Sequence, residues 1–436
     1  MTSEASDSPS STPAPPPHYR RNFAALLGDY VAFGLGAAFA AGTTVVPDYI
    51  ARLTDSPIVV GLVRTIADGA WLLPQLFFAN LLVNKRRKKP YVIWSGLIGR
   101  PTWLLYAAAL FLGLARFPAV AIVLLFSLYL VFLGFDSLAA VAWFDILAKA
   151  IPEARRGRLV GLAQLIQGVL AIGVGAIVAA LLSDRGPPFP FNYAIIFGLA
   201  GCFYLLSLAA FSPIIEPAEA VAEARPAWRE YLPQLLRLLR KDRTFRRLVA
   251  VRLLSGFDML AWTFYILFAT RQVGLPPITV GLFVSVQTAG GIAGSLLLGL
   301  ISDRVGSHRV IQVATAVSVT APLVGLGLAL SGIGSGTLAA ILCGYTFFVL
   351  GLVGSSFMLG HLNYVLDLAP AGQRPIYVGL LNTLGGAIVV LPPLGGLLLQ
   401  YTSYPVLFAL TAAFVLLGHI LSWRLPSVRK REGEGG

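Results

Sequence analysis

The chain has 436 residues, of which 57% are hydrophobic and 12% are charged, and its mean hydropathy is +0.78. Soluble globular proteins carry about 25% charged residues, so this composition excludes a soluble enzyme or binding module. The net charge of +13 would suit a nucleic-acid partner, but the placement of the charges along the chain argues against that class.

Twelve apolar segments follow one another, each long enough to cross a hydrocarbon core of about 30 Å. Such segments must be helical, because lipid offers no partner to an unpaired backbone group. The sequence therefore predicts an all-α membrane protein with twelve transmembrane helices. We place them at residues 23–46, 58–83, 91–113, 118–148, 158–182, 193–213, 244–270, 278–301, 308–331, 336–362, 376–399 and 404–424.

The two halves of the chain repeat each other. Residues 57–62 read Pro-Ile-Val-Val-Gly-Leu, and residues 277–282, which lie 220 positions later, read Pro-Ile-Thr-Val-Gly-Leu. Two similar halves rich in membrane-length segments are typical of transporters whose site lies between the halves. We expect two pseudo-symmetric six-helix bundles at 21–213 and 244–425, joined by a cytoplasmic linker at 214–243.

The segments outside the bundles have no transport signature. Residues 1–20 are rich in Ser and Pro and lack the basic start and apolar core of a signal peptide, so we expect a disordered cytoplasmic tail. Residues 426–436 form a second expected cytoplasmic tail. From Trp228 onward the linker places leucines opposite basic residues, which predicts an amphipathic helix on the membrane surface. A binding site for a protein partner is the alternative there.

The basic residues are distributed unevenly across the membrane. With both termini inside, cytoplasmic segments hold 26 of the 33 Lys and Arg residues, and outer loops hold four. This is the positive-inside pattern, so the basic charge indicates topology and not a nucleic-acid partner. We expect a multi-pass protein of the plasma (inner) membrane with both termini cytoplasmic. The remaining three, Arg64, Arg100 and Arg252, lie within predicted spans.

The loop after the eighth span has a recognisable signature. Residues 299–309 read Gly-Leu-Ile-Ser-Asp-Arg-Val-Gly-Ser-His-Arg. This resembles the loop motif of the major facilitator superfamily, in which a small residue, Asp and Arg follow a Gly, and a second Gly and basic residues come next. The resemblance covers about residues 21–425 and implies a twelve-helix transporter that works by alternating access. It implies a cytoplasmic gating loop made of Gly299, Asp303, Arg304, Gly306 and Arg309.

The equivalent loop of the first half departs from this motif, because Asn84 stands where the aspartate is expected. The gating role therefore carries over only to Asp303. By two-fold symmetry its partners should lie near the start of the fifth span. We hypothesise a latch that closes the inner face, with Asp303 shaping the loop alone as the alternative. The expected partners of the latch are Arg155, Arg156 and Arg158.

Several ionisable residues lie inside the predicted spans, where each costs at least about 2.5–3.5 kcal/mol on insertion scales. Arg64 and Asp68 are four residues apart on one helix face, so an internal ion pair is expected. Asp29, Asp136 and Asp258 lie in the first, fourth and seventh spans, and the resemblance implies that these helices line the central cavity. A buried carboxylate there could bind and release a proton, so we predict a role in proton coupling or substrate binding.

Two neighbours of Asp258 complete the candidate set. Arg252 precedes it by six residues and so lies on another helical face, whereas Trp262 follows one turn later on the same face. An aromatic ring beside an acid suits a cationic or amphipathic organic solute, with ordinary helix packing as the alternative.

The chain lacks the Gly-x-x-x-x-Gly-Lys-Ser/Thr motif of nucleotide-driven pumps, and it carries no pattern of a metal cluster or catalytic triad. We therefore expect a transporter without a cofactor, and not an enzyme. Its expected partners are a small-molecule substrate, protons and the lipid bilayer, and we expect a monomer.

The sequence constrains the substrate and the direction of transport less than it constrains the fold. Residues 168–175 of the fifth span lack the proline of the drug-antiporter signature of the resembled family. The spans nevertheless carry few polar groups of the kind that bind a sugar, which favours proton-coupled export of an amphipathic organic solute. One alternative is uptake of a small polar solute by proton symport. The other is a membrane sensor or scaffold that does not transport, which only the departing first-half loop favours.

Overall fold

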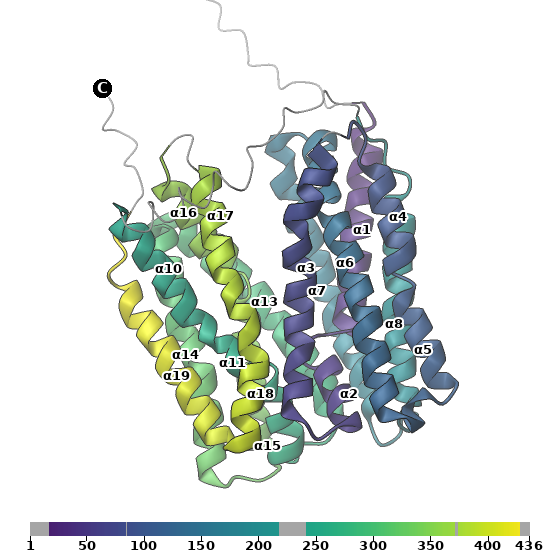
Figure 1. The fold of residues 1–436 in the computed structure, drawn as a ribbon, viewed down its shortest axis with the longest axis vertical. Helices are drawn as coiled ribbons and strands as arrows, with labels where there is room; N and C mark the ends of the chain where they lie inside the picture. The colour runs from purple at the N-terminus through teal and green to yellow at the C-terminus, as the bar shows by residue number, and fades with distance from the viewer. Residues whose placement is uncertain (1–16, 84, 218–240, 371–373, 428–436) are drawn as a thin grey trace, which may run out of the picture.

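The computed structural model describes residues 17–83, 85–217, 241–370 and 374–427. The expected amphipathic helix after Trp228 lies outside these residues, as does most of both expected tails. The helices fall into two groups that stand side by side (Figure 1). We call the end of the molecule where α1 begins and α19 ends the terminal end, and the opposite end the distal end.

The first group contains the helices up to residue 211. They are α1 (Tyr19–Phe39), α2 (Val45–Leu53), α3 (Pro57–Val83), α4 (Lys89–Gly99), α5 (Thr102–Phe111), the short η1 (Leu114–Arg116), α6 (Pro118–Ala150), α7 (Glu153–Leu182) and α8 (Phe191–Phe211).

The second group begins at residue 243 and contains more interrupted helices. They are α10 (Arg243–Ser255), η2 (Gly256–Asp258), α11 (Met259–Trp262), α12 (Phe264–Leu267), η3 (Phe268–Gln272), α13 (Ile278–Val305), α14 (Ser307–Ser331), α15 (Thr337–Val353), η4 (Phe357–Leu362), α16 (Asn363–Leu368), α17 (Arg374–Gly385), η5 (Gly386–Val390), α18 (Leu391–Tyr401) and α19 (Tyr404–Ser422).

Within the part of the chain that the structure describes, eleven helices are long and apolar enough to cross a membrane. The one predicted span outside this set is the third, 91–113. It is present as α4 and α5, which break at Arg100 and Pro101 and so contain 11 and 10 residues. Proline lacks the backbone N–H that would continue the helical ladder, which explains the break. The predicted all-helical membrane fold is confirmed.

Two other predicted spans have different bounds from those expected. The first ends at Phe39 instead of residue 46, because the chain turns there before α2. The eleventh is interrupted at η5, which is wound as a tighter helix and ends just before Pro392 and Pro393. Both prolines lie in the first turn of α18, where a missing N–H is harmless.

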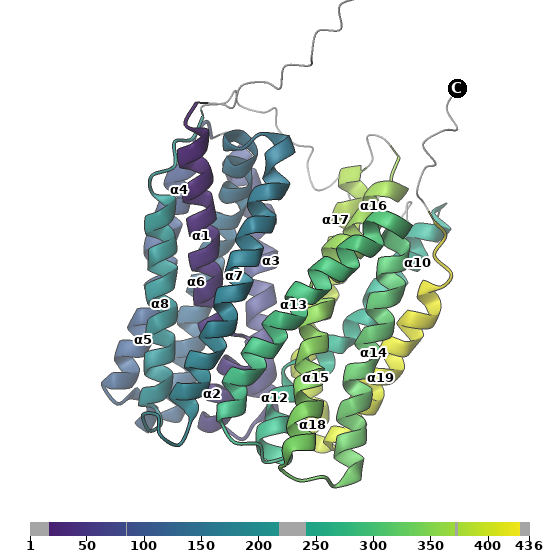
Figure 2. The same ribbon diagram turned by 180° about the vertical axis from the view of Figure 1, so that it is seen from behind.

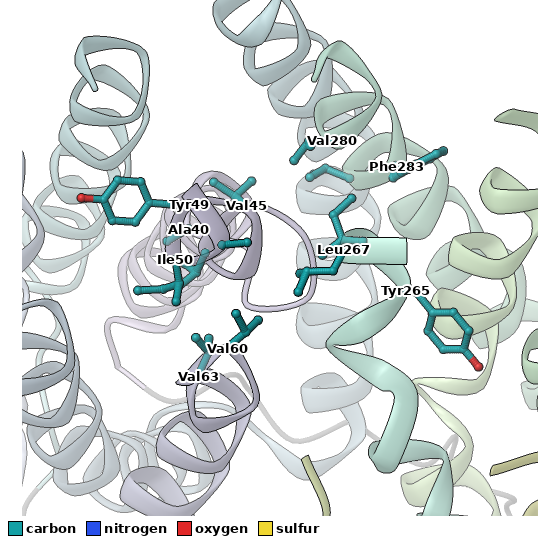
Figure 3. Packing of buried hydrophobic residues seen from close by; sticks show 14 of the residues in the cluster. Ala40, Val45, Tyr49, Ile50, Val60, Val63, Tyr265, Leu267, Val280 and Phe283 are labelled. Carbon is teal, nitrogen blue, oxygen red and sulfur yellow. The ribbon is translucent and has the colours of Figure 1, made fainter. Parts of the chain in front are cut away.

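The two groups share one hydrophobic core in the distal part of the molecule. This cluster joins α2 and α3 of the first group to α12 and α13 of the second. Figure 3 shows Val45 and Ile50 on one side of the boundary, with Leu267 and Val280 on the other. Toward the terminal end the buried clusters are separate, since each contains residues of one group alone. The two groups are therefore packed together distally and have independent cores at the terminal end (Figures 1 and 2).

Close helix contacts reinforce the distal junction. A Cβ added at Gly61 of α3 would lie 2.6 Å from the Pro392 carbonyl oxygen of α18, and one at Gly281 of α13 would lie 2.1 Å from the Ala179 nitrogen of α7. Gly61 and Gly281 occupy the same position of the sequence repeat. Small residues allow membrane helices to approach closely, so the repeated motif marks where the two groups touch.

Polar contacts also cross this junction. The Thr43 hydroxyl donates to the Gln287 side-chain oxygen over 2.8 Å, and the Ser285 hydroxyl donates to the Ile172 carbonyl over 2.8 Å. At the distal surface the Arg271 guanidinium lies 3.2 Å from the carboxylate of Asp55. The Thr65 hydroxyl donates to the Val389 carbonyl over 2.7 Å.

Candidate functional site

A cavity of about 330 Å³ lies inside the first group of helices, between α1, α3, α4, α6 and α7. Two acids line it, Asp29 near the middle of α1 and Asp136 near the middle of α6. Both carboxylates lie far from the ends of their helices, and Asp29 is buried. The cavity therefore brings together two of the three acids that the sequence predicted for coupling.

Arg100 supplies the balancing charge. Its Nη1 lies 3.6 Å from Asp29 Oδ1, and the same nitrogen donates to the Ser207 hydroxyl over 2.6 Å and to the Tyr204 carbonyl over 3.2 Å. Arg100 and Asp29 are 5% and 4% exposed, so the pair is buried. Arg100 is also within electrostatic range of Asp136. With both acids ionised, one guanidinium faces two carboxylates, and the site has a net negative charge.

Two tryptophans orient the carboxylates. The Trp143 indole N–H donates to Asp29 Oδ2 over 2.8 Å, and the Trp71 indole N–H donates to Asp136 Oδ2 over 3.1 Å. Aromatic rings line much of the remaining wall, including Phe33. A negative site between aromatic faces can hold a proton or a positively charged group of a larger apolar molecule.

Arg100 was not among the site residues expected from the sequence, although it is a charge inside an apolar span. Its partner Asp29 comes from α1, which is 71 positions earlier in the chain, so no local spacing indicates the pair. The rule that intramembrane charges are paired or functional would have included it.

A second group of charges lies at the boundary between the two helix groups. Arg64 Nε is 2.8 Å from Asp68 Oδ2, and these side chains are 24% and 27% exposed. The Arg64 guanidinium also lies 5.5 Å from the centre of the Trp262 ring, across the boundary. Arg252 and Arg64 are both within electrostatic range of Asp258. Five of the predicted site residues therefore lie together at the boundary between the two helix groups. They are Arg64, Asp68, Arg252, Asp258 and Trp262.

The arrangement differs from the expectation in one respect. Trp262 was expected to act beside Asp258, but its ring instead contacts a cation from the opposite helix group. The Arg252 guanidinium lies over the Phe357 ring, 4.7 Å from its centre. The chain tightens at η2, between Arg252 and Asp258, so simple helical spacing does not describe their relation.

The loop between α13 and α14 turns at Gly306, whose φ of +107° is a conformation that favours glycine. Asp303 and Arg304 are exposed at the terminal end. Arg309 donates to the Gln312 side chain over 2.8 Å. A Cβ at Gly299 would meet nothing within 4 Å, so packing does not require that glycine.

The arginines near the start of α7 are held within the first helix group. The Arg155 guanidinium lies 4.9 Å from the centre of the Tyr19 ring, and Arg156 Nε donates to the Ile151 carbonyl over 3.0 Å. Arg158 is exposed. Among the described residues, no ion pair joins Asp303 to any of the three. The hypothesised latch therefore stays a prediction.

The first-half loop is fixed by a different network. Glu216 accepts hydrogen bonds from the backbone nitrogens of Lys88 and Lys89, each over 2.8 Å. Asp145 of α6 lies 2.6 Å from Lys149 Nζ and also pairs with Lys88. These contacts join the basic loop to its own helix group, which offsets the lack of an acid at Asn84.

Comparison with known proteins decides the family. The Major Facilitator Superfamily model matches residues 31–387 and again residues 259–436. The chain belongs to the Major Facilitator Superfamily. Members of this superfamily are multi-pass secondary transporters of small solutes in the lipid bilayer, and not enzymes.

Solved superfamily structures share the fold at low sequence identity. A bacterial homologue of the iron transporter ferroportin in an inward-facing state gives a TM-score of 0.65 at 14% identity, covering 93% of this chain and 98% of that one. A mutant of the nucleoside transporter NupG gives a TM-score of 0.67 at 13% identity, and the match covers 93% of this chain and 100% of that one. A bacterial homologue of the lysosomal transporter Spinster gives 0.61 at 12% identity, covering 95% and 99%.

The curated relatives that match this chain do not indicate a substrate. Uncharacterized proteins of Mycobacterium tuberculosis and Mycobacterium bovis are 23% identical over 292 residues, which is 66% of this chain. The match spans 55% of the length of those relatives.

Proposed function

We propose that this superfamily transporter couples proton entry to the export of an amphipathic organic solute. The observation that carries the proposal is the cavity around Asp29 and Asp136, which places two acids and one arginine in an aromatic and aliphatic wall. An amphipathic solute with a basic group fits both features. A sugar would need many hydrogen-bonding side chains, and few line this cavity.

The two acids have different tasks in this proposal. Asp29 is paired with Arg100 and accepts a hydrogen bond from Trp143, so it fixes the position of the guanidinium. Asp136 accepts a hydrogen bond from the Trp71 indole and is less buried than Asp29. We assign Asp136 as the group that exchanges a proton for the positive group of the solute.

The proposed orientation places the terminal end in the cytoplasm. It is supported by the excess of basic residues in the loops at that end. The shared distal core and the separate terminal cores then correspond to a conformation open to the cytoplasm. The moving bodies are the bundles 21–213 and 244–425, with 214–243 as their linker.

Alternation requires the distal junction to open while the terminal end closes. The contacts of α3 with α18 and of α7 with α13 are the surfaces on which the bundles would rock. The charges around Arg64 and Asp258 lie at this boundary, where a change of bundle angle alters their distances. Closure would bring Asp303 toward Arg155, Arg156 and Arg158, which forms the proposed latch.

The test is substrate-dependent proton flux in proteoliposomes, screened with a panel of amphipathic amines, organic anions, sugars and nucleosides. We expect amines to drive proton movement opposite to their own. Asp136→Asn should abolish proton flux while solute exchange at equal concentrations continues. Asp184→Asn, which changes an exposed acid of the distal loop, is the matched control and should behave as the unmodified protein.

Two outcomes would replace the proposal. Proton and solute movement in the same direction, with a small polar solute, would indicate uptake by symport. If no solute in the panel produced exchange or proton flux, although the protein was folded, the non-transporting sensor or scaffold would be the better explanation.

A further inference from the structure

A second hollow, of about 390 Å³, lies at the terminal end between α10 and α19, away from the transport cavity. Four arginines line it, together with Ala250 and Leu421. The arginines are Arg243, Arg246, Arg247 and Arg424. No carboxylate lines this hollow among the residues that the structure describes. The described lining of the hollow is therefore basic, and the transport mechanism does not use it.

The sequence builds this site from two helix ends. Arg243, Arg246 and Arg247 follow the three- and four-residue spacing that places side chains on one face of α10. Arg424 comes just after the end of α19, and its carbonyl accepts a hydrogen bond from Arg247 over 3.4 Å. That contact holds the two helix ends together around the hollow.

The nearby acid, Asp242, has hydrogen-bond partners outside the hollow. Asp242 precedes Arg243 in the sequence, but its carboxylate accepts hydrogen bonds from the Phe245 nitrogen and the Tyr377 hydroxyl, each over 2.9 Å. It caps α10 and joins it to α17. Asp242 is not among the residues that line the hollow.

The depth of the hollow indicates its ligand. One turn deeper, Gly418 of α19 packs on α10, since an added Cβ would lie 2.9 Å from the Ser255 nitrogen. This close packing limits the depth of the hollow, which lies where α10 begins and α19 ends. Leu417 is 52% exposed and lies on the same face of α19 as Leu421 and Arg424, so an apolar surface continues from the site along the membrane.

We propose that this hollow binds the phosphate headgroup of an anionic glycerophospholipid, with an acyl chain along α19 below it. Guanidinium groups bind phosphate oxygens in a bidentate manner, and basic pockets between membrane helices are suited to such headgroups. A zwitterionic choline headgroup would bring a positive charge into a site of four arginines, so binding should favour anionic lipids.

The test measures binding of phosphatidylglycerol to the purified full-length protein in detergent, by native mass spectrometry and by the thermal-unfolding midpoint. Phosphatidylcholine and soluble glycerol 3-phosphate are measured alongside. We expect phosphatidylglycerol to bind and stabilise more strongly than either. The variant Arg246→Gln/Arg247→Gln/Arg424→Gln should lose at least about tenfold in apparent affinity, because charge-assisted contacts to phosphate are removed.

The matched control is Lys85→Gln/Arg86→Gln/Arg87→Gln, which removes three exposed basic residues elsewhere at the terminal end. It should bind phosphatidylglycerol as the unmodified protein does. Equal loss in the control, or full affinity in the arginine variant, would overturn the proposal. Equal stabilisation by glycerol 3-phosphate would reassign the site to a soluble phosphate. If the triple variant does not fold, Arg247→Gln and Arg424→Gln alone should each weaken binding about threefold, and unchanged affinity in both would overturn it.

Discussion

Gly281 of α13 lies directly against Ala179 of α7, and a Cβ on the glycine would stand 2.1 Å from the Ala179 amide nitrogen. The neighbouring atom belongs to the backbone, which cannot move aside as a flexible side chain would. This contact is one of several by which the helix groups meet at the distal end. A methyl group at this position would therefore clash with the backbone of the opposite group.

Gly281→Ala should shift the protein away from the conformation described here. Overpacking costs about 1–3 kcal/mol, which is a change of about 5- to 150-fold in the ratio of two conformations. The expected result is greater labelling, from the distal side, of a cysteine introduced at Thr43. Gly173→Ala on α7 is the control, because its Cβ would meet nothing within 4 Å, and its labelling should equal that of the parent.

Arg100→Gln should be strongly destabilising, because it leaves the Asp29 carboxylate buried without its cation. Breaking a buried ion pair from one side costs about 3–5 kcal/mol. We expect a lower thermal-unfolding midpoint in detergent. The double variant Arg100→Gln/Asp29→Asn should recover much of the loss, since no buried charge then remains unpaired. Additive losses in the double variant would show that the two side chains do not interact.

Asp303→Asn should disfavour closure of the terminal end without changing the open conformation. Spin labels at Gly157→Cys and Val305→Cys, both exposed, would report the separation of the two helix groups. A surface ion pair changes the ratio of closed to open molecules by about 2- to 5-fold. An unchanged distance distribution, compared with the labelled parent, would rule out the latch and leave Asp303 with a role in the loop alone.

Asp145→Asn should weaken the terminal end of the first helix group but leave proton coupling intact. The substitution removes the charge that pairs with both Lys88 and Lys149. Charge-assisted hydrogen bonds contribute about 1.5–3 kcal/mol, so a lower unfolding midpoint is expected. Loss of proton flux with an unchanged midpoint would contradict this assignment and place Asp145 on the transport path.

The sequence predicts the spans well because hydrocarbon leaves a continuous apolar segment with no alternative to a helix. The sequence is a poorer guide to where a helix ends or is interrupted. The break at Pro101 follows from the missing backbone N–H of proline, and α1 ends at Phe39 because the chain turns there before α2. Mean hydropathy over a span reports neither feature. The repeat correctly draws attention to Gly61 and Gly281, although only the structure shows that they touch the opposite group.

The candidate site is predicted in part for a related reason. Charges inside spans identify Asp29, Asp136 and the Arg64–Asp68 pair without any knowledge of the fold. Which acid faces which cation is a property of tertiary structure, and so Arg100 was missed. The choice between distal and terminal opening could not be predicted at all, because one sequence must adopt both conformations.

The interrupted third span has a consequence for how the protein is made. An arginine at mid-membrane makes α4 and α5 poor candidates for insertion into lipid as an isolated segment. The partner that offsets this cost, Asp29, belongs to α1, which leaves the ribosome first. Synthesis order therefore supplies the anion before the cation, and stable integration of the third span should wait until it docks on the first. In a truncated chain that begins after α1, Arg100 would enter the translocon without its carboxylate partner.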